Sequence, residues 1–262
     1  MSLLEISHAD ISYGKRVIVK DFSLTMEKGQ ICSIVGESGS GKTTVIRAVM
    51  GLLAGGGKVT AGEILYEGQS LLAFSDKQWR DLRGHDISMI FQDSGAMMNQ
   101  TRKIGNSYTE YIRTHENIGS SEAWKKGAKM LERMRLPDPD RIMRSYPFQL
   151  SGGQRQRVGI AMGMTYRPRL LLADEPTSAL DVTTQAQIVR QMMELRDEYG
   201  TSIIIVTHDL GVASYMADNI VVMKDGAIED QGVRDYMLHE SGNAYTRKLL
   251  EAVPSLGGRR YV

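Results

Sequence analysis

QICSIVGESGSGKTTVIRAVM, residues 30–50, is the stretch of this chain that decides its fold. It begins with a short apolar run from Gln30 to Val35, which predicts a strand buried on both faces. A glycine-rich turn follows, and a helix is expected from about Lys42 to Met50. The turn matches G-x-x-x-x-G-K-[ST], a pattern that binds phosphate groups when it joins a strand to a helix.

The residue types in this turn suit phosphate binding. Its glycines let the backbone bend tightly and point N–H groups at phosphate oxygens, and the helix start adds a positive end. Lys42 can reach the β- and γ-phosphates, and the Thr43 hydroxyl can bind Mg²⁺. We therefore expect the nucleotide to contact Gly36, Glu37, Ser38, Gly39, Ser40, Gly41, Lys42, Thr43 and Thr44.

The composition fits a globular protein of 262 residues, with 42% apolar and 24% charged residues. The formal net charge of +1 gives no electrostatic reason to expect a nucleic-acid partner, although patches can hide inside a neutral total. The single cysteine, Cys32, excludes an intramolecular disulfide framework and any zinc site of the Cys-pair type. No segment approaches the roughly 20 apolar residues that span a bilayer, so we expect an intracellular protein that reaches a membrane through partners.

Hydrophobic patterning predicts three regions. Alternation over residues 4–13 and from Val17 to Met26 indicates antiparallel strands, and Gly62 is expected to precede a short strand from Glu63 to Glu67. The Met-rich stretch from about Asn99 to Tyr146 has a helical pattern and predicts an inserted helical subdomain.

From Leu170 onward, strands alternate with helices, which is typical of a mostly parallel, covered sheet. Asp225–Gly226 is a hairpin turn signal. The expected strands are Leu170–Asp174, Ser202–Thr207 and Asn219–Lys224, and the expected helices are Thr183–Tyr199, Leu210–Ala217 and Ala244–Ala252.

A second phosphate-type motif stands at residues 150–154, which read LSGGQ. Ser151, Gly152 and Gly153 precede a helix expected from Gln154 to Met164, which makes a second helix end able to bind an anion. The pentapeptide is the signature of ABC transporter ATP-binding subunits. The chain resembles that family along nearly its whole length, with the motifs in the family's order.

The resemblance implies an α/β fold. A P-loop NTPase core of ABC ATPase type, residues 1–92 and 165–262, would include an antiparallel β subdomain, and residues 93–164 would form the inserted helical subdomain with the signature. It also implies a head-to-tail dimer with two composite sites. Each ATP would lie between the turn of one subunit and Ser151, Gly152, Gly153 and Gln154 of the other.

The resemblance also assigns roles near the γ-phosphate. Asp174, at the end of an apolar strand, would bind Mg²⁺ together with Thr43 and Gln92. Glu175 would be the general base that activates the attacking water. His208 would contact the γ-phosphate, and with Glu175, Gln92 and Lys42 it completes the expected catalytic set.

Two further residues have alternative interpretations. Asp181, in the stretch SALD at residues 178–181, matches the family's loop that signals between the two sites, and it could equally be the N-cap of the following helix. Tyr13, at the end of the first strand, resembles the aromatic residue that stacks on adenine. The alternative for Tyr13 is an ordinary half-exposed strand tyrosine.

The resemblance implies Mg-dependent ATP hydrolysis and an importer. DNA-repair members carry long coiled coils, ribosome-acting members usually carry two cassettes, and exporters commonly fuse membrane helices to the cassette; none of these features is present. The expected partners are a second ABC ATPase subunit, identical or related, two membrane permease subunits and an extracellular substrate-binding protein, at the cytoplasmic face of the membrane. The alternative is an accessory ATPase of a cytosolic enzyme complex such as carbon–phosphorus lyase.

Three segments resemble the peptide and nickel importers: residues 87–93, residues 144–150, and residues 243–250 with Val253-Pro254. Two features depart from that group. The stretch after Gln92 usually contains Leu-Asn-Pro, whereas residues 97–100 read MMNQ, and the chain lacks the cysteine-bearing extension of many peptide-type members. The second departure favours nickel-type or metallophore-type members, so the expected cargo is peptides or nickel and other metal chelates.

Overall fold

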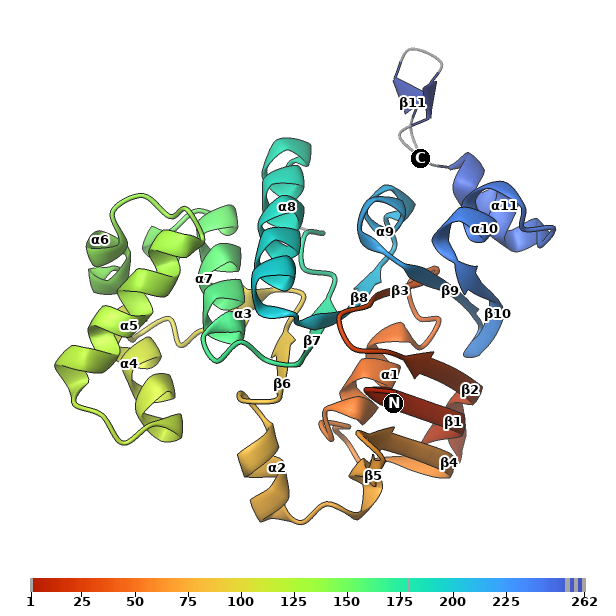
Figure 1. Ribbon diagram of the computed structural model, residues 1–262, viewed down its shortest axis with the longest axis horizontal. Helices are drawn as coiled ribbons and strands as arrows, with labels where there is room; N and C mark the ends of the chain where they lie inside the picture. The colour runs from red at the N-terminus through yellow and green to blue at the C-terminus, as the bar shows by residue number, and fades with distance from the viewer. Residues whose placement is uncertain (1, 179, 253–254, 257–258, 261–262) are drawn as a thin grey trace.

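Two sheets organise the computed structural model, which describes residues 2–178, 180–252, 255–256 and 259–260 (Figure 1). A six-stranded sheet has the order β10-β9-β3-β8-β7-β6, and a four-stranded sheet has the order β2-β1-β4-β5. The strands are β1 Leu4–Tyr13, β2 Arg16–Met26, β3 Ile31–Val35, β4 Gly57–Tyr66, β5 Gln69–Ser70, β6 Ile87–Ile90, β7 Leu170–Asp174, β8 Ser202–Thr207, β9 Asn219–Lys224, β10 Ala227–Val233, β11 Ser255–Leu256 and β12 Arg259–Arg260, the last two forming a separate pair.

The helices lie between and around these sheets. They are α1 Lys42–Val49, α2 Asp76–Leu82, α3 Ser94–Met97, α4 Ile104–His115, α5 Ser120–Arg133, α6 Pro139–Arg144, α7 Gly152–Met164, α8 Val182–Tyr199, α9 Leu210–Met216, α10 Arg234–His239 and α11 Ala244–Glu251, with 3-10 turns at Leu71–Ala73 and Pro147–Gln149. In the part of the chain that the structure describes, no helix has both the length and the apolar character needed to cross a membrane.

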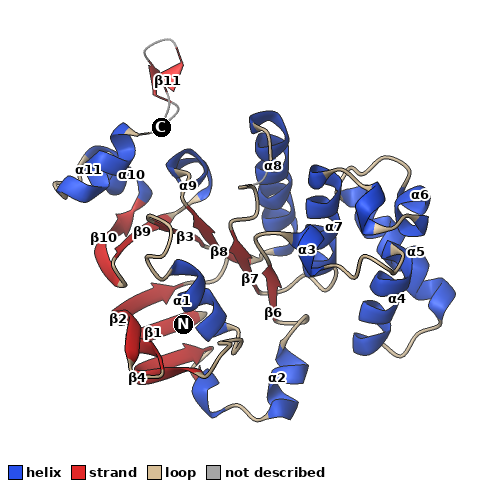
Figure 2. Ribbon diagram, turned by 180° about the vertical axis from the view of Figure 1, so that it is seen from behind, coloured by secondary structure: helices blue, strands red, loops and turns tan. Residues whose placement is uncertain are grey.

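The central sheet is covered on both faces, as the apolar run before the glycine turn predicts. Strands β3, β7 and β8 are buried along their whole length and pair in parallel. Alternate residues face opposite layers: Cys32 and Ile34 pack with α1 and the antiparallel sheet, whereas Ile31 packs with the helical layer. Helix α1 contacts strands of both sheets and lies between them (Figure 2).

The helical region packs against the edge of the central sheet that ends in β6 (Figure 1). Helices α4, α5 and α6 contact one another, and α5 also contacts α7. Tyr108 of α4 is fully buried, and its hydroxyl lies 2.8 Å from the Thr165 hydroxyl at the end of α7. The α/β fold with an antiparallel sheet and an inserted helical region is therefore confirmed, and the exact division at residues 93 and 164 stays a prediction.

Three local features differ from the expectations. Strand β4 runs from Gly57 through Gly62, so the prediction that it begins at Glu63 was wrong. Gly62 lies at a bulge with φ +78, where a Cβ would be 2.3 Å from the His8 carbonyl oxygen. The glycine therefore lets the backbones of β4 and β1 come close together, and it does not mark the start of a strand. Helices α2 and α10 were not foreseen; Ser75 caps α2 through a capping box with Gln78, which is a signal readable in the sequence.

Gly105 provides a test of the packing in the helical region. A Cβ at this position in α4 would lie 2.2 Å from the Trp124 ring and 2.7 Å from the Met143 carbonyl oxygen. Gly105→Ala should therefore destabilise the chain by about 1–3 kcal/mol, measured by chemical denaturation. Gly242→Ala is the matched control, because nothing lies within 4 Å of a Cβ there. Equal denaturation midpoints for the two variants would contradict the packing described.

Candidate active site

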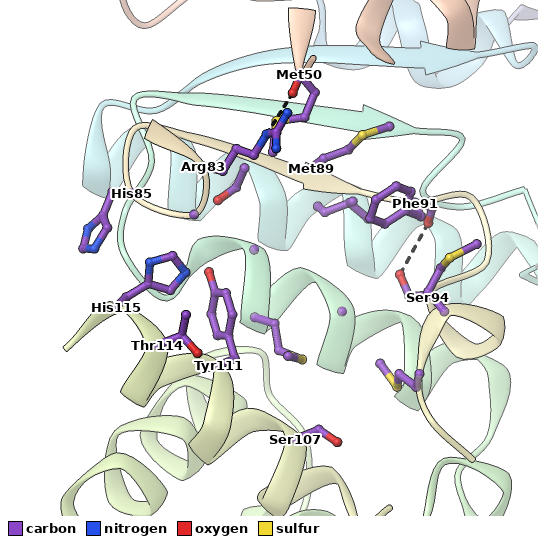
Figure 3. Close-up of a pocket in the computed structure, with 18 of the residues that line it drawn as sticks. Met50, Arg83, His85, Met89, Phe91, Ser94, Ser107, Tyr111, Thr114 and His115 are labelled. Carbon is purple, nitrogen blue, oxygen red and sulfur yellow. Dashed lines mark hydrogen bonds between the residues drawn. The ribbon is translucent and has the colours of Figure 1, made fainter. Parts of the chain in front are cut away.

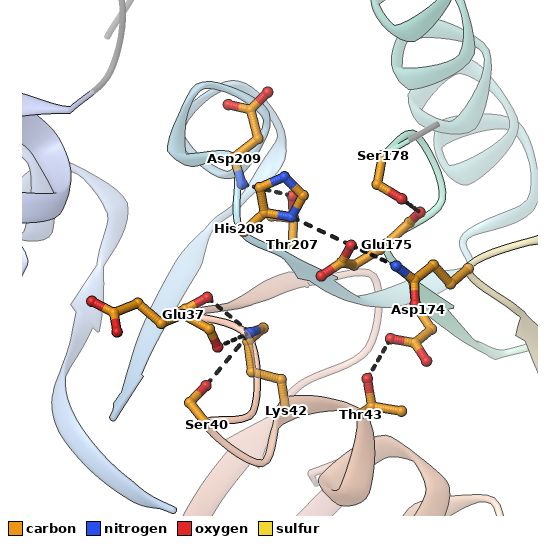
Figure 4. A network of polar contacts seen from close by, with 12 residues as sticks. Glu37, Ser40, Lys42, Thr43, Asp174, Glu175, Ser178, Thr207, His208 and Asp209 are labelled. Carbon is orange, nitrogen blue, oxygen red and sulfur yellow. Dashed lines mark hydrogen bonds and ion pairs between the residues drawn. The ribbon is translucent and has the colours of Figure 1, made fainter. Parts of the chain in front are cut away.

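The glycine-rich turn between β3 and α1 wraps around a buried ammonium group (Figure 4). Lys42 is only 5% exposed, and its Nζ donates to the carbonyl oxygens of Gly36, at 2.8 Å, and Glu37, at 2.7 Å. Burial lowers the pKa of Lys42, and the negative charges of Glu175, Asp174 and Glu37 act in the opposite direction. A compact cation is thus held at the N-terminal end of α1.

The start of the turn tolerates only glycine. Gly36 has φ +152, and a Cβ there would lie 2.1 Å from the main-chain oxygen of Met223 in β9. The N-cap of α1 is Gly41, which has no side chain to accept hydrogen bonds from the first turn. The N–H groups at the start of α1 therefore point into the turn without a side-chain cap, which suits an anionic ligand.

Strand β7 delivers a carboxylate to the same place. Asp174 is only 2% exposed, and its Oδ1 accepts a hydrogen bond of 2.8 Å from the Thr43 hydroxyl. Burial raises the pKa of Asp174, and the Thr43 hydrogen bond and the Arg47 charge partly offset the effect. A carboxylate and a hydroxyl are oxygen ligands that Mg²⁺ prefers, and a bound cation would offset the cost of the buried charge on Asp174, so this pair fits a magnesium site.

Glu175 is the next residue, and its backbone is strained. It has φ +42, in the left-handed region, and its N–H donates to the Val206 carbonyl oxygen at 2.8 Å. Such a conformation costs of order 1–3 kcal/mol in a residue with a side chain. Strain of this kind persists where neighbouring structure holds it, and here it fixes the direction of one carboxylate.

Two side chains that follow other strands contact that carboxylate. Figure 4 labels one of them, His208, beside Glu175. Gln92, which follows β6, donates from Nε2 to Glu175 Oε2 at 3.1 Å. His208, which follows β8, has its Nδ1 3.3 Å from the same oxygen. Because β6, β7 and β8 are parallel neighbours, their carboxyl ends bring these three residues to one edge of the sheet.

The signature residues are placed at the start of α7, where they form a capping box. Ser151 Oγ accepts from Gln154 N–H at 3.3 Å, and Gln154 Oε1 accepts from Ser151 N–H at 2.9 Å. A Cβ at Gly153 would lie 2.8 Å from the Thr184 methyl group in α8. The signature therefore contacts the first turn of α8 within its own chain, a different place from the carboxylates around Lys42.

Asp181 caps α8, as one of the two sequence interpretations predicts. Its carboxylate accepts from the Thr184 N–H at 2.9 Å and from the Thr184 hydroxyl at 2.8 Å, and the backbone hydrogen bond lowers the pKa of Asp181. The signalling role stays a prediction. Residue 179 of the same stretch lies outside the described residues, as do Val253 and Pro254.

Tyr13 lies elsewhere, at the end of β1 on the antiparallel sheet. Its ring covers Gly57, where a Cβ would lie 2.7 Å from a ring carbon. The side chain is half-buried, and contact with adenine stays a prediction.

Asp209, which the sequence motifs do not indicate, stabilises the loop that carries His208. Asp209 Oδ1 accepts from Gly211 N–H at 2.8 Å and caps α9, and its Oδ2 accepts from Gln185 of α8 at 2.7 Å. Asp209 thereby fixes the backbone next to His208. An aspartate directly before an apolar helical pattern is an N-cap signal that could have indicated it.

The buried Asp174 gives a pH-dependent test. Asp174→Asn should raise the melting temperature of the ligand-free chain at neutral pH, by about 2–4 °C for each kcal/mol of penalty removed. The pKa of Asp174 is raised in the folded state, so the buried charge destabilises the wild type at pH values above that pKa. The destabilisation disappears at pH values below the pKa of an ordinary carboxyl group, where Asp174 is protonated in both states. The gain should therefore shrink on acidification in melting curves.

Asp81→Asn, at an exposed position of α2, is the control and should leave the melting temperature unchanged. A lower melting temperature for Asp174→Asn at neutral pH would show that burial of this carboxylate carries no penalty.

Comparison with known proteins shows the family of this chain. The family model described as ABC transporter matches residues 19–178. The oligopeptide transport ATP-binding protein OppD of Bacillus subtilis (strain 168) is 41% identical over 259 residues, covering 97% of this chain and 72% of OppD. The dipeptide transport ATP-binding protein DppD of the same strain is 42% identical over 247 residues, covering 94% of this chain and 74% of DppD.

Solved structures extend the comparison to three dimensions. The ATP-binding cassette MJ0796, as a dimer in a post-hydrolysis state bound to ADP and Pi, superposes with a TM-score of 0.78 at 29% identity, covering 88% of this chain and 98% of that chain. The glycine turn, the signature and the carboxylates at the sheet edge are thus found together in a chain whose relatives are ATP-binding subunits. This chain belongs to the ABC transporter family, as an ATP-binding subunit that hydrolyses ATP.

Proposed function

We propose that this chain powers an importer of peptides by hydrolysing ATP between two cassette subunits. The observation that carries the proposal is the convergence of Lys42, Asp174 and Glu175, with their partners, at one edge of the central sheet. The names of the related proteins, which are oligopeptide and dipeptide transport ATP-binding proteins, support the cargo class.

The chain's own residues would perform the reaction at this edge. The N–H groups of the turn and the Lys42 ammonium bind the β- and γ-phosphates. The Glu175 carboxylate, fixed by its strained backbone, accepts the proton of a water that attacks the γ-phosphorus while the bond to the β-phosphate oxygen breaks. Gln92 and His208 orient Glu175 and the water through the contacts at Oε2.

Thr43 and Asp174, with Gln92, would hold Mg²⁺. When bound, the ion neutralises the charge of the phosphates. The hydroxyl–carboxylate pair observed here supplies the oxygen donors for it.

A second cassette subunit would complete each site. The signature residues lie on α7, against α8 and away from the turn of their own chain, so they can serve the triphosphate of a partner. The dimeric MJ0796 structure supports such a pair. In a two-fold arrangement, each ATP joins two subunits and its hydrolysis releases them.

The groove between β6 and the helical region would receive the membrane subunits (Figure 3). Its volume is about 770 Å³. Phe91 and Ser94 lie toward one end of the groove, and Tyr111 and His115 lie toward the other (Figure 3). Met97, which is exposed, also lines the groove. Gln92 directly follows Phe91, so a segment docked in the groove would act on the same loop that contacts Glu175.

The remaining partners follow from the same proposal. Two permease subunits and an extracellular substrate-binding protein would select the cargo, with this chain at the cytoplasmic face of the membrane. Import of nickel or other metal chelates, the second cargo class expected from the sequence, stays a prediction. An accessory ATPase of a cytosolic enzyme complex is the alternative, and copurification of polytopic membrane proteins would decide against it.

The proposed base gives the first test. Glu175→Gln should bind Mg-ATP normally, lose at least about a hundredfold in turnover, and accumulate as an ATP-bound dimer in gel filtration. Lys42→Ala is the matched comparison and should instead lose nucleotide affinity. Normal turnover in Glu175→Gln would remove Glu175 from the role of base, and unchanged affinity in Lys42→Ala would count against the phosphate loop.

The groove gives the second test. Met97 is 64% exposed, and Met97→Glu would place a charge where an apolar segment docks. The variant, coexpressed with the membrane subunits, should copurify about tenfold less of them while it binds Mg-ATP normally. Val233→Glu, at an exposed apolar position on β10, is the control. Equal copurification of the two variants would place the docking surface elsewhere.

A further inference from the structure

Helix α3 begins two residues after Gln92 and packs against α7, the helix that starts at the signature (Figure 2). Two glycines allow this close approach. A Cβ at Gly159 of α7 would lie 2.4 Å from the Ser94 hydroxyl oxygen, and a Cβ at Gly95 of α3 would lie 2.5 Å from Nε of an arginine on α7. That arginine is Arg155, one turn before Gly159, so α3 covers one face of α7.

The Arg155 side chain reaches from this contact to the start of the signature. It is half-buried, and its Cδ also lies against α3, 2.8 Å from the position of a Cβ at Gly95. Its Nη1 donates a hydrogen bond of 2.6 Å to the Leu150 carbonyl oxygen. One side chain thus connects the backbone of α3 with the backbone that enters the signature.

The peptide group between Leu150 and Ser151 is held on both sides. Ser151 is the N-cap of α7, so the Leu150 carbonyl lies outside the hydrogen-bond pattern of the helix and depends on a side chain. Arg155 supplies that partner, and the N–H of the same peptide donates to Gln154 Oε1 at 2.9 Å. Because a peptide group is planar, the two hydrogen bonds together fix its orientation.

Helix α3 is itself fixed where it supports the arginine. Asp93 Oδ1 accepts from the Ala96 N–H at 2.9 Å and caps the helix. Gln100 Nε2 donates to the Gly95 carbonyl oxygen at 2.7 Å. The stem of Arg155 therefore lies on a backbone that hydrogen bonds hold in place, at a position where any larger residue would push it aside.

We propose that Arg155 is a positioning residue of the signature. Supported by α3, its guanidinium holds the peptide between Leu150 and Ser151 in the orientation that receives the triphosphate of a partner subunit. The inference rests on the proposed pairing of two cassettes. Because the signature would serve the partner's ATP, loss of Arg155 should weaken ATP-driven pairing and leave nucleotide binding by the single chain intact.

The test is made in a parent chain that carries Glu175→Gln, so that ATP is retained. Arg155→Met removes the guanidinium and keeps an unbranched stem. The dissociation constant of the dimer in Mg-ATP, measured by sedimentation equilibrium, should rise at least about tenfold, as expected for losing a hydrogen bond from a charged donor at each of two sites. The affinity for Mg-ADP, measured by calorimetric titration, should equal that of the parent.

Two further variants separate the hydrogen bond from the side chain's bulk. Arg155→Lys keeps a charged donor that can reach the Leu150 carbonyl, so its pairing should be closer to the parent's than to that of Arg155→Met. Arg190→Met, at an exposed position of α8, is the matched control and should pair like the parent.

Gly95→Ala tests the support from α3 and repeats the test if Arg155→Met does not fold. Its Cβ would displace the arginine stem, so pairing in Mg-ATP should weaken while the affinity for Mg-ADP stays unchanged.

A purely structural arginine gives a different result. Arg155→Met and Gly95→Ala would then have lower melting temperatures and would pair in Mg-ATP as tightly as the parent. That outcome would overturn the role of Arg155 and leave the proposed function intact. If the parent itself did not pair in Mg-ATP, the proposed pairing of cassettes would be wrong, and this inference with it.

Discussion

A positive charge buried at the end of β3 is the constraint on which the rest of the structure depends. The Lys42 ammonium has lost most of its water, so it must be surrounded by oxygen atoms. The turn supplies carbonyl groups from Gly36 and Glu37, and the carboxyl end of β7 supplies the charges of Asp174 and Glu175. A parallel sheet with its carboxyl ends aligned is the arrangement that delivers these groups from distant parts of the chain to one place.

The same arrangement makes the ligand-free site costly. Asp174 is charged in a place that disfavours charge, and Glu175 has a backbone conformation that side chains rarely adopt. Both costs are met by contacts in the surrounding sheet, such as the hydrogen bond from Glu175 to Val206. A cation bound with the triphosphate would offset the cost of the buried charge on Asp174. Ligand binding should therefore stabilise this edge of the sheet.

Much of this could be predicted from the sequence because the motifs are local. Gly36 to Thr43 and Ser151 to Gln154 are continuous stretches, and apolar runs such as Leu170–Asp174 report burial on both faces. The bulge at Gly62 could not be predicted, because its cause is the close approach of His8 on another strand. A lone glycine within a strand pattern looks the same whether it marks a break or a bulge.

Contacts between distant segments escaped prediction for the same reason. Nothing local to Tyr245 indicates that it belongs to the same apolar cluster as Val35, and the groove beside β6 exists only after the helical region has packed against the sheet. Asp209 carried a local signal, since an aspartate before an apolar helical pattern is a typical cap, but its contact with Gln185 did not. The motifs in the sequence therefore indicate which residues act at the site, whereas the contacts that hold those residues in place are seen only in the packed structure.

The position of Cys32 has a practical consequence for spectroscopy. The only thiol of the chain is buried on β3, and burial raises its pKa to about 12, so it is hardly ionised at neutral pH. Maleimides and nitroxide reagents attack thiolates at accessible positions and should leave it unmodified in the folded protein. The chain should therefore need no removal of its own cysteine before labelling. Single cysteines introduced at the surface could then be labelled to follow movements of the helical region by fluorescence or electron spin resonance.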